Sequence, residues 1–263
     1  MEACEAAGVA VWVLDRPDPM GGHITGGPML DQDLQSFIGI HPVPQVYGMT
    51  PGEWARMIRA ERTPDLDLRV IAMDGWRRGM NFGELGWVWI PTSQHIPHWE
   101  TSYFYAMTGT LGELHKLNNG VGTPSPFELV GTQWLDPQAF AAGLNAYQLP
   151  GVIFRATSFK PRYAFGSGEL LHGVQIHISD FATVDATQVA QALAVELIRT
   201  APERQLFDAM ETASGKVSMY LKAHGDRGLA KLLAENDLNA YSKTDKSALE
   251  SFRERRSEYL IYR

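Results

Sequence analysis

The sequence predicts an α/β protein whose last third is mostly helical. A capping box at Thr50-Pro51-Gly52-Glu53 opens a helix to about Glu61, because the threonine hydroxyl can accept from the glutamate amide while the glutamate side chain returns to the cap. The strand-like segments Phe37–Ile40 and Leu66–Ala72 flank this helix and predict a βαβ unit. Of the 25 glycines and 15 prolines, all but four lie at or before residue 180. This distribution predicts short elements and shaped loops before that point and helices after it.

The first 14 residues predict a helix end that leads into a strand. Met1–Ala7 is typical of a helix tail, and Gly8 suits the C′ position, where φ is positive. Val9–Leu14 is nearly all apolar, which predicts a strand that is buried on both faces of a parallel sheet. Since a domain rarely begins with a helix end followed by a central strand, we expect the chain to start inside an α/β domain. A genuine N-terminal helix is the alternative.

The later elements follow from capping residues and from the spacing of apolar side chains. In Gly173–Ser179, apolar and polar residues alternate, which predicts a strand with one buried face. Tyr259–Tyr262 predicts a terminal strand or a packed tail. The other elements predicted in this way are a helix from Asp136 to about Asn145, a strand at Val152–Ser158, a helix at Thr187–Ala201, and shorter helices near 216–224, 227–235 and 245–256.

The composition narrows the class of protein. The 263 residues carry 23 Lys and Arg against 30 Asp and Glu, and the net charge of −7 argues against a binder of nucleic acid or of an anionic membrane. The single cysteine, Cys4, excludes an internal disulfide framework and a cysteine-built zinc site. No apolar run approaches the ~18 residues of a membrane span, and the first residues lack the basic and apolar regions of a secretory signal. These features are typical of an acidic globular enzyme or small-ligand binder.

Four loop segments stand out in a sequence that has no phosphate-loop, nucleophile-elbow or zinc-protease motif. They are Asp15–Gly22, Trp76–Arg78, Pro91–Pro97 and Asn118–Glu128. The first of them leaves the C-terminal end of a predicted strand, which is where open α/β sheets bind their ligands. The loops are therefore the places to search for functional residues.

An ordered set of segments carries a family resemblance. In chain order, the segments are LDRPDPMGG, SFIGIHPVPQVYGMTPGE, VIAMDGWRR, PTSQHIP, NNGVGTPSPFELVG, LPGVIFR and GVQIHISD. This set resembles the exo-β-N-acetylmuramidase (NamZ-like) family, which was formerly catalogued as a domain of unknown function. The resemblance runs from about Ala6 to the closing YLIY and so covers essentially the whole chain.

The resemblance implies both an architecture and an activity. It implies a partial Rossmann-like domain over residues 1–115, whose start is missing, then a smaller α/β domain over 116–263, with the ligand cleft between them. It implies a cofactor-free glycosidase, periplasmic or secreted, that releases terminal N-acetylmuramic acid from the non-reducing end of peptidoglycan fragments. Gly26 and Val121 depart from the family pattern, and a carboxylate proposed as catalytic in relatives would lie in the missing stretch. A non-catalytic module that binds muropeptides or other carbohydrates is therefore the alternative.

Two carboxyl groups are the candidate catalytic residues, because glycoside hydrolysis usually needs an acid near the leaving oxygen and a base or nucleophile opposite it. Glu128 follows Phe127 in a partly apolar setting that favours a protonated acid; a loop-closing hydrogen bond is the alternative. Asp15 ends an apolar strand beside Arg16, which favours the ionised carboxylate and hence an orienting role. For Asp15, tying down the loop that follows is the slightly favoured alternative.

Other polar and aromatic loop residues are candidates to bind the sugar. Arg77 offers a planar fork for the lactyl carboxylate of a muramyl sugar, with a surface ion pair as the alternative, and a surface ion pair is the role expected of Arg78. Trp76 belongs to a group of four tryptophans that would stack on sugar faces or fill gaps under loops. His95 and His98 lack a third ligand at a regular spacing, so no metal site is expected. The remaining candidates are Arg16, His95, Glu100, Asn118, Gly120, Gly122, Gln175 and His177. A structural role is the alternative for Glu100, Asn118, the two glycines, Gln175 and His177.

Overall fold

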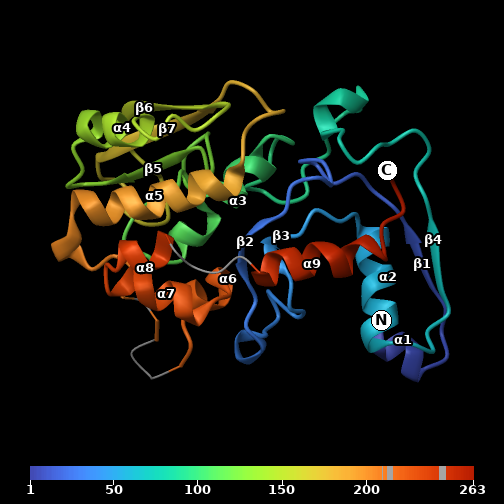
Figure 1. The fold of residues 1–263 in the computed structure, drawn as a ribbon. Coiled ribbons are helices and arrows are strands. Elements are labelled where there is room, and N and C mark those ends of the chain that lie inside the picture. The colour runs from blue at the N-terminus through green and yellow to red at the C-terminus, as the bar shows by residue number, and fades with distance from the viewer. Residues whose placement is uncertain (209, 212–215, 243–246) are drawn as a thin grey trace. The chain divides into compact units, whose positions relative to one another are not determined.

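The computed structural model describes residues 1–208, 210–211, 216–242 and 247–263 (Figure 1). The fold is α/β, as the sequence predicts. The chain forms two compact units, each assembled from segments that are distant in the sequence. Unit 1 comprises Met1–Gly26, Val46–Trp89 and Lys246–Arg263, and unit 2 comprises Gly27–Gln45 and Ile90–Asp245. The predicted division along the chain into 1–115 and 116–263 stays a prediction.

Unit 1 is organised around two parallel strands joined by a helical crossover. β1 (Val11–Leu14) pairs with β4 (Leu68–Ile71), with Val11 opposite Leu68 and Leu14 opposite Ile71. Parallel strands need a long connection, and α2 (Pro51–Arg62) lies within it and alongside both strands (Figure 1). The other elements of the unit are α1 (Glu2–Ala6), the 3-10 turn η2 (Phe82–Leu85) and α9 (Ser247–Ser257).

α2 begins as the capping box predicts. The Glu53 amide donates to the Thr50 hydroxyl at 3.3 Å, and the Thr50 amide donates to Glu53 Oε2 at 3.1 Å. A cap of this kind stabilises a helix by about 1 kcal/mol. The helix contacts β1 and β4 and buries Ala55, Met57 and Ile58. The predicted helix at residues 50–61 is therefore confirmed.

The prediction of Phe37–Ile40 as the first strand of the βαβ unit is wrong, because β1 pairs with the strand after the helix. The backbones of Ser36 and Gly39 exchange hydrogen bonds of 2.8 and 3.1 Å, which bend the segment into a turn. Phe37, inside that turn, is 99% exposed. Apolar side chains around a turn give this segment the composition of a strand without the extended backbone.

β1 is also less buried than predicted. Its side chains alternate between half-buried and exposed, and Trp12 and Leu14 are 58% and 69% exposed. Among the described residues β1 has one neighbouring strand, and α2 lies against the pair, so part of the apolar surface faces solvent. The prediction of a strand buried on both faces is therefore wrong.

Three antiparallel strands form the sheet at the centre of unit 2, in the order β5 (Leu129–Thr132), β7 (Leu171–Ile178), β6 (Val152–Phe159). Val174 and Ile176 of β7 are buried, whereas Gln175 and His177 are not, so the predicted alternation is confirmed. The helices of this unit are α3 (Thr101–Gly112), α4 (Pro137–Asn145), α5 (Ala186–Thr200), α6 (Met219–His224), α7 (Arg227–Ala234) and α8 (Leu238–Ser242).

The helices of unit 2 pack on the sheet and on one another. α4 contacts β6 and β7 and also α5, which in turn contacts α3 (Figure 1). Phe140 and Leu144 of α4 are fully buried. The remaining elements are a two-stranded sheet of β2 (Gly26–Met29) and β3 (Pro44–Val46), and the 3-10 turns η1 (Gln32–Leu34) and η3 (Pro202–Arg204).

The last third of the described chain is mostly helical, as predicted, and it ends in a packed tail. The predicted helix near 245–256 corresponds to α9, and its expected first residues lie outside the described ones. After α9, Tyr262 is only 8% exposed, and its hydroxyl accepts from the Met73 amide at 2.8 Å. Of the two predicted states for Tyr259–Tyr262, the packed tail is the one observed.

Candidate functional site

A glycine-rich loop leads from α3 to Glu128, the residue before β5, and the side chain of Asn118 holds the loop together. The Asn118 side-chain nitrogen donates to the Val121 and Phe165 carbonyls at 3.0 and 2.9 Å. Its side-chain oxygen accepts from the Gly120 amide at 2.7 Å. These contacts fit the structural role that was the alternative for Asn118, and its role in sugar binding stays a prediction.

The two glycines of this loop make room for the chain's own backbone. Gly120 and Gly122 have φ angles of 87° and 93°, which side chains strongly disfavour. A Cβ atom at Gly120 would overlap the Ser125 carbonyl, and one at Gly122 would overlap the Tyr163 carbonyl. Because protein backbone fills this space, contact between these glycines and a ligand stays a prediction.

Phe127, immediately before Glu128, has a strained backbone. Its φ of 69° is rare for a bulky residue and costs about 1–2 kcal/mol. The Phe127 amide donates to the Asn119 carbonyl at 2.7 Å, and its carbonyl accepts from Thr108 Oγ1 of α3 at 2.9 Å. Strain of this kind persists where surrounding contacts enforce it. Here those contacts fix the direction in which the chain passes from the loop to Glu128.

Glu128 is the first residue in a chain of hydrogen-bonded polar side chains that extends across the sheet. Glu128 Oε2 accepts from Gln175 Nε2 at 3.2 Å, and Gln175 Oε1 accepts from Arg155 Nη2 at 2.5 Å. Arg155 Nε in turn donates to His177 Nε2 at 3.3 Å. We call these four residues the polar row. It brings together three residues predicted from the sequence and adds Arg155, which was not among the predicted site residues.

The geometry of Glu128 suits chemistry on a bound molecule. The residue is half-buried, and its Oε1 atom has no hydrogen-bond partner among the described residues. A carboxyl group that is held through one oxygen and open at the other can transfer a proton to a group bound beside it. The polar row is therefore the candidate functional site of unit 2.

Asp15, at the end of β1, is surrounded by donors. Its Oδ1 accepts from the Arg16 and Gly52 amides at 2.9 and 2.7 Å, and its Oδ2 accepts from the Thr50 and Tyr262 hydroxyls, both at 2.7 Å. The residue is 7% exposed. These four donors tie the end of β1 to α2 and to the C-terminal tail. The arrangement fits the structural alternative for Asp15, and its catalytic role stays a prediction.

A buried ion pair stabilises the same end of unit 1. Glu53 is fully buried and pairs with Arg78, whose side chain is 13% exposed. Glu53 Oε1 also accepts from the Ile261 and Tyr262 amides at 2.8 and 3.3 Å. A surface ion pair was expected for Arg78, and that expectation is wrong because the C-terminal tail and α2 enclose the pair.

Asp18, in the loop after β1, has a perturbed carboxyl group. Burial raises the pKa of Asp18 to about 6, and the nearby Glu53 carboxylate adds to the rise. The Met20 amide, which donates to Asp18 at 3.0 Å, and the Arg78 and Arg256 guanidinium groups oppose the shift. A carboxyl group with this pKa beyond the end of a parallel strand is a candidate proton donor. The sequence predicted a functional role for this loop but not for Asp18, because burial is not visible in a sequence.

The other predicted residues of unit 1 differ in exposure. Trp76 is 5% exposed, its indole N–H donates to the Met80 carbonyl at 3.2 Å, and its ring packs edge-on against Tyr262. Trp76 thus fills space in the core, as its structural alternative stated. Arg16 and Arg77 are exposed, and neither guanidinium has a partner among the described residues.

The other predicted residues of unit 2 lie before and at the start of α3. His95 Nε2 lies 3.0 Å from the Tyr163 hydroxyl. Glu100 occupies the N-cap position of α3 but makes no side-chain cap bond. Within the part of the chain that the structure describes, no three His, Cys, Asp or Glu side chains converge in a way that could hold a metal ion. In that same part, no helix combines the length and apolar character needed to cross a membrane.

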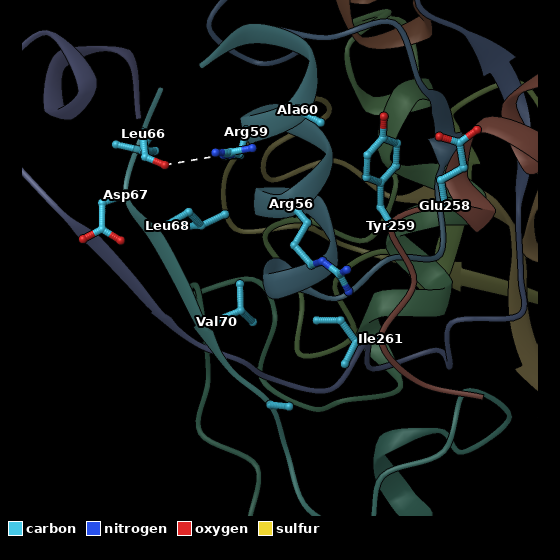
Figure 2. Close-up of a pocket in the computed structure, with 11 residues that line it drawn as sticks. Arg56, Arg59, Ala60, Leu66, Asp67, Leu68, Val70, Glu258, Tyr259 and Ile261 are labelled. Atoms are coloured by element: carbon cyan, nitrogen blue, oxygen red, sulfur yellow. Dashed lines mark hydrogen bonds between the residues drawn. The ribbon is translucent and has the colours of Figure 1, made fainter. Parts of the chain in front are cut away.

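Unit 1 also has a hollow between α2, β4 and the end of the chain, with a volume of about 650 Å³ (Figure 2). Arg56 and Arg59 line it from α2, and Glu258 and Tyr259 line it from the tail. Arg59 Nε donates to the Leu66 carbonyl at 3.5 Å. None of the site residues predicted from the sequence lines this hollow.

The fold and the polar row define a class of α/β proteins in which a glycine-rich loop positions a carboxyl group that has one oxygen without a hydrogen-bond partner among the described residues. Comparison with known proteins makes the class specific. Residues 1–100 match the family described as "Exo-beta-N-acetylmuramidase NamZ, N-terminal", and residues 103–262 match "Exo-beta-N-acetylmuramidase NamZ, C-terminal". The chain belongs to the exo-β-N-acetylmuramidase NamZ family, which confirms the resemblance drawn from its sequence segments.

Individual relatives agree with this family. The chain is 34% identical over 265 residues to the peptidoglycan β-N-acetylmuramidase NamZ of Bacillus subtilis (strain 168). That alignment covers 100% of this chain and 62% of the relative, so the chain spans less than two thirds of the relative's length. A DUF1343 family protein of Bacteroides fragilis NCTC 9343 has a crystal structure that matches with a TM-score of 0.88 at 32% identity, covering 100% of this chain and 69% of that one. A second protein of that family from the same organism matches over the same shares with a TM-score of 0.70 at 23% identity, and supports the fold alone.

Proposed function

We propose that the chain is a glycoside hydrolase that releases terminal N-acetylmuramic acid from the non-reducing end of peptidoglycan fragments. The observation that carries this proposal is the 34% identity, across the whole chain, to a relative named as a peptidoglycan β-N-acetylmuramidase. The match to both parts of the family description supports it. The site of action that we propose is the periplasm or the outside of the cell, where peptidoglycan lies.

We assign the role of proton donor to Glu128. Glycosidases need a carboxylic acid beside the leaving oxygen, and Glu128 has one oxygen held by Gln175 and one oxygen open. The strained backbone of Phe127 fixes the chain that leads to it. A donor so held loses little freedom on binding substrate, which favours proton transfer.

The other predicted residues take supporting roles in this proposal. Asp15, with its four donors, shapes the loop that carries Arg16 and Asp18 and is expected to orient the substrate without reacting. Gln175 and His177 present polar groups on the same sheet as Glu128 and are expected to bind sugar hydroxyls or the acetamido group. We expect muropeptides to be the ligands. No cofactor enters the proposed chemistry.

The experiment that tests the proposal is a release assay with the full chain. A chromogenic β-N-acetylmuramide and a muropeptide are incubated with the protein, and free N-acetylmuramic acid is quantified. We expect release from both substrates, and the same rate with a metal chelator present. Calorimetric binding of the muropeptide without release would overturn the hydrolase and favour the binding module. Neither binding nor release would overturn both functions.

A further inference from the structure

Arg155 lies on the exposed face of the three-stranded sheet of unit 2. In β6, Arg155 is opposite Gln175 of β7, and Ile153 is opposite His177. Because residues two apart on a strand share a face, all four side chains project from the same face of the sheet. Arg155 and Ile153 are both exposed, and Ile153 is 53% exposed. This face therefore presents a cation beside an apolar side chain.

The guanidinium group of Arg155 is held on one side and open on the other. Its Nε atom donates to His177 Nε2, and its Nη2 atom donates to Gln175 Oε1. These two contacts occupy the side of the guanidinium group that carries Nε and Nη2. Nη1 has no hydrogen-bond partner among the described residues, and no described carboxylate lies within ion-pair distance of the group. An oriented guanidinium with a free end is suited to bind a carboxylate through parallel N–H donors.

We propose that Arg155 binds the lactyl carboxylate of N-acetylmuramic acid and so selects muramyl over glucosaminyl sugars. This inference rests on the proposed function and names the residue that recognises the acidic part of its substrate. Ile153, next to Arg155 on the same face, offers an apolar contact to the lactyl methyl group. Gln175 links Arg155 to Glu128, so the anion would bind one side chain away from the proton donor.

The same role was expected from the sequence for Arg77, and the structure favours Arg155. The Arg77 guanidinium is exposed and has no partner among the described residues that would orient it. Arg155 is already oriented by two contacts, so less side-chain entropy is lost when a carboxylate binds. A net charge of −7 also makes a local cation necessary to attract an acidic sugar.

The test compares ligands that differ only in the carboxylate. Binding of N-acetylmuramic acid and of its methyl ester to the full chain is measured by titration calorimetry or protein NMR. The wild type is expected to prefer the free acid by about tenfold or more, the scale of a charge-assisted hydrogen bond. Arg155→Met is expected to abolish this preference, and Arg155→Lys to restore part of it. Arg162→Met, at an exposed arginine of the same unit whose guanidinium has no partner in the described part of the chain, is the matched control.

The outcomes separate this inference from the proposed function. A wild type that does not prefer the acid, or an Arg155→Met variant that keeps the preference with an unchanged circular dichroism spectrum, would overturn the inference. Loss of the preference in Arg77→Met but not in Arg155→Met would overturn it in favour of Arg77. A chain that prefers the acid through Arg155 but releases no sugar would leave the inference standing and overturn the hydrolase.

Discussion

Two buried carboxylates of unit 1 and the carboxylate of the polar row in unit 2 have opposite surroundings. Asp15 and Glu53 are buried, and donors from α2, the loops and the C-terminal tail engage both oxygens of each. Glu128 is half-buried, and one of its oxygens has no partner among the described residues. All three residues belong to the sequence segments that carry the family resemblance.

The number of hydrogen bonds that a carboxylate accepts from the chain distinguishes structural carboxylates from reactive ones. A carboxylate whose acceptor positions are filled by the chain contributes to stability, because its removal leaves buried donors unpaired. A carboxylate with an open oxygen contributes little to stability and is free to act on a ligand. We therefore expect substitutions of Asp15 and Glu53 in unit 1 to reduce the stability of the fold. Substitution of Glu128 in unit 2 should reduce activity and leave folding intact.

The largest effect on stability should come from Glu53→Gln. This change removes the buried charge that pairs with Arg78 and should lower the free energy of unfolding by about 3–5 kcal/mol. Urea denaturation of the variant measures it. Asp74→Asn, at an exposed aspartate of the same unit, is the control and should change stability by less than about 0.5 kcal/mol. If Glu53→Gln were as stable as the wild type, the structural role assigned to the buried carboxylates of unit 1 would be wrong.

A second effect concerns the core of unit 2 at low pH. Burial lowers the pKa of His224 to about 4, although its side chain donates to the Asp226 carbonyl. Between pH of about 6.5 and 4 the unfolded chain binds a proton that the folded chain does not, so stability falls with falling pH by up to about 3 kcal/mol. The difference between wild type and His224→Gln in urea denaturation across this range measures the effect. Exposed His98 supplies the control, His98→Gln, and identical pH profiles for all three proteins would contradict the prediction.

Asp18 in unit 1 should have the opposite pH dependence. Burial raises its pKa to about 6, so between pH of about 4 and 6 the folded chain keeps a proton that the unfolded chain has lost. Stability should therefore fall as pH rises through this window, by at most about 3 kcal/mol. Asp18→Asn should remove this part of the profile, as measured by thermal unfolding at several pH values. Retention of the full profile by the variant would show that another group titrates.

The smallest effect on stability should come from Glu128→Gln. Glu128 makes one side-chain hydrogen bond in the described structure, and the amide preserves an oxygen acceptor for it. We expect the free energy of unfolding to change by less than about 1 kcal/mol. A loss as large as that of Glu53→Gln would mean that Glu128 is a structural carboxylate too.

Local signals in the sequence predicted the elements that depend on neighbouring residues. The capping box at Thr50 set the start of α2, and the alternation around Ile176 identified β7 and its two faces. Pairing over long distances left no such signal. The partner of β4 is β1, which lies more than 50 residues away, whereas Phe37–Ile40 has the composition of a strand and forms a turn.

The candidate site could be predicted only in part. Gln175 and His177 were found because they alternate with buried residues on a strand, and Glu128 because it follows a glycine-rich loop. Arg155 was missed because its place beside Gln175 depends on the register of two strands. Glu53 was assigned only as a helix cap, since its ion pair with Arg78 arises from tertiary contacts.

The role of Glu128 is tested by the rate of N-acetylmuramic acid release by Glu128→Gln, taken together with the urea midpoint of this variant. If Glu128 is the proton donor, the rate should fall at least about a hundredfold, the usual scale of general acid catalysis, while the midpoint stays close to that of the wild type. A variant that folds normally and releases the sugar at the full rate would contradict the assignment of Glu128.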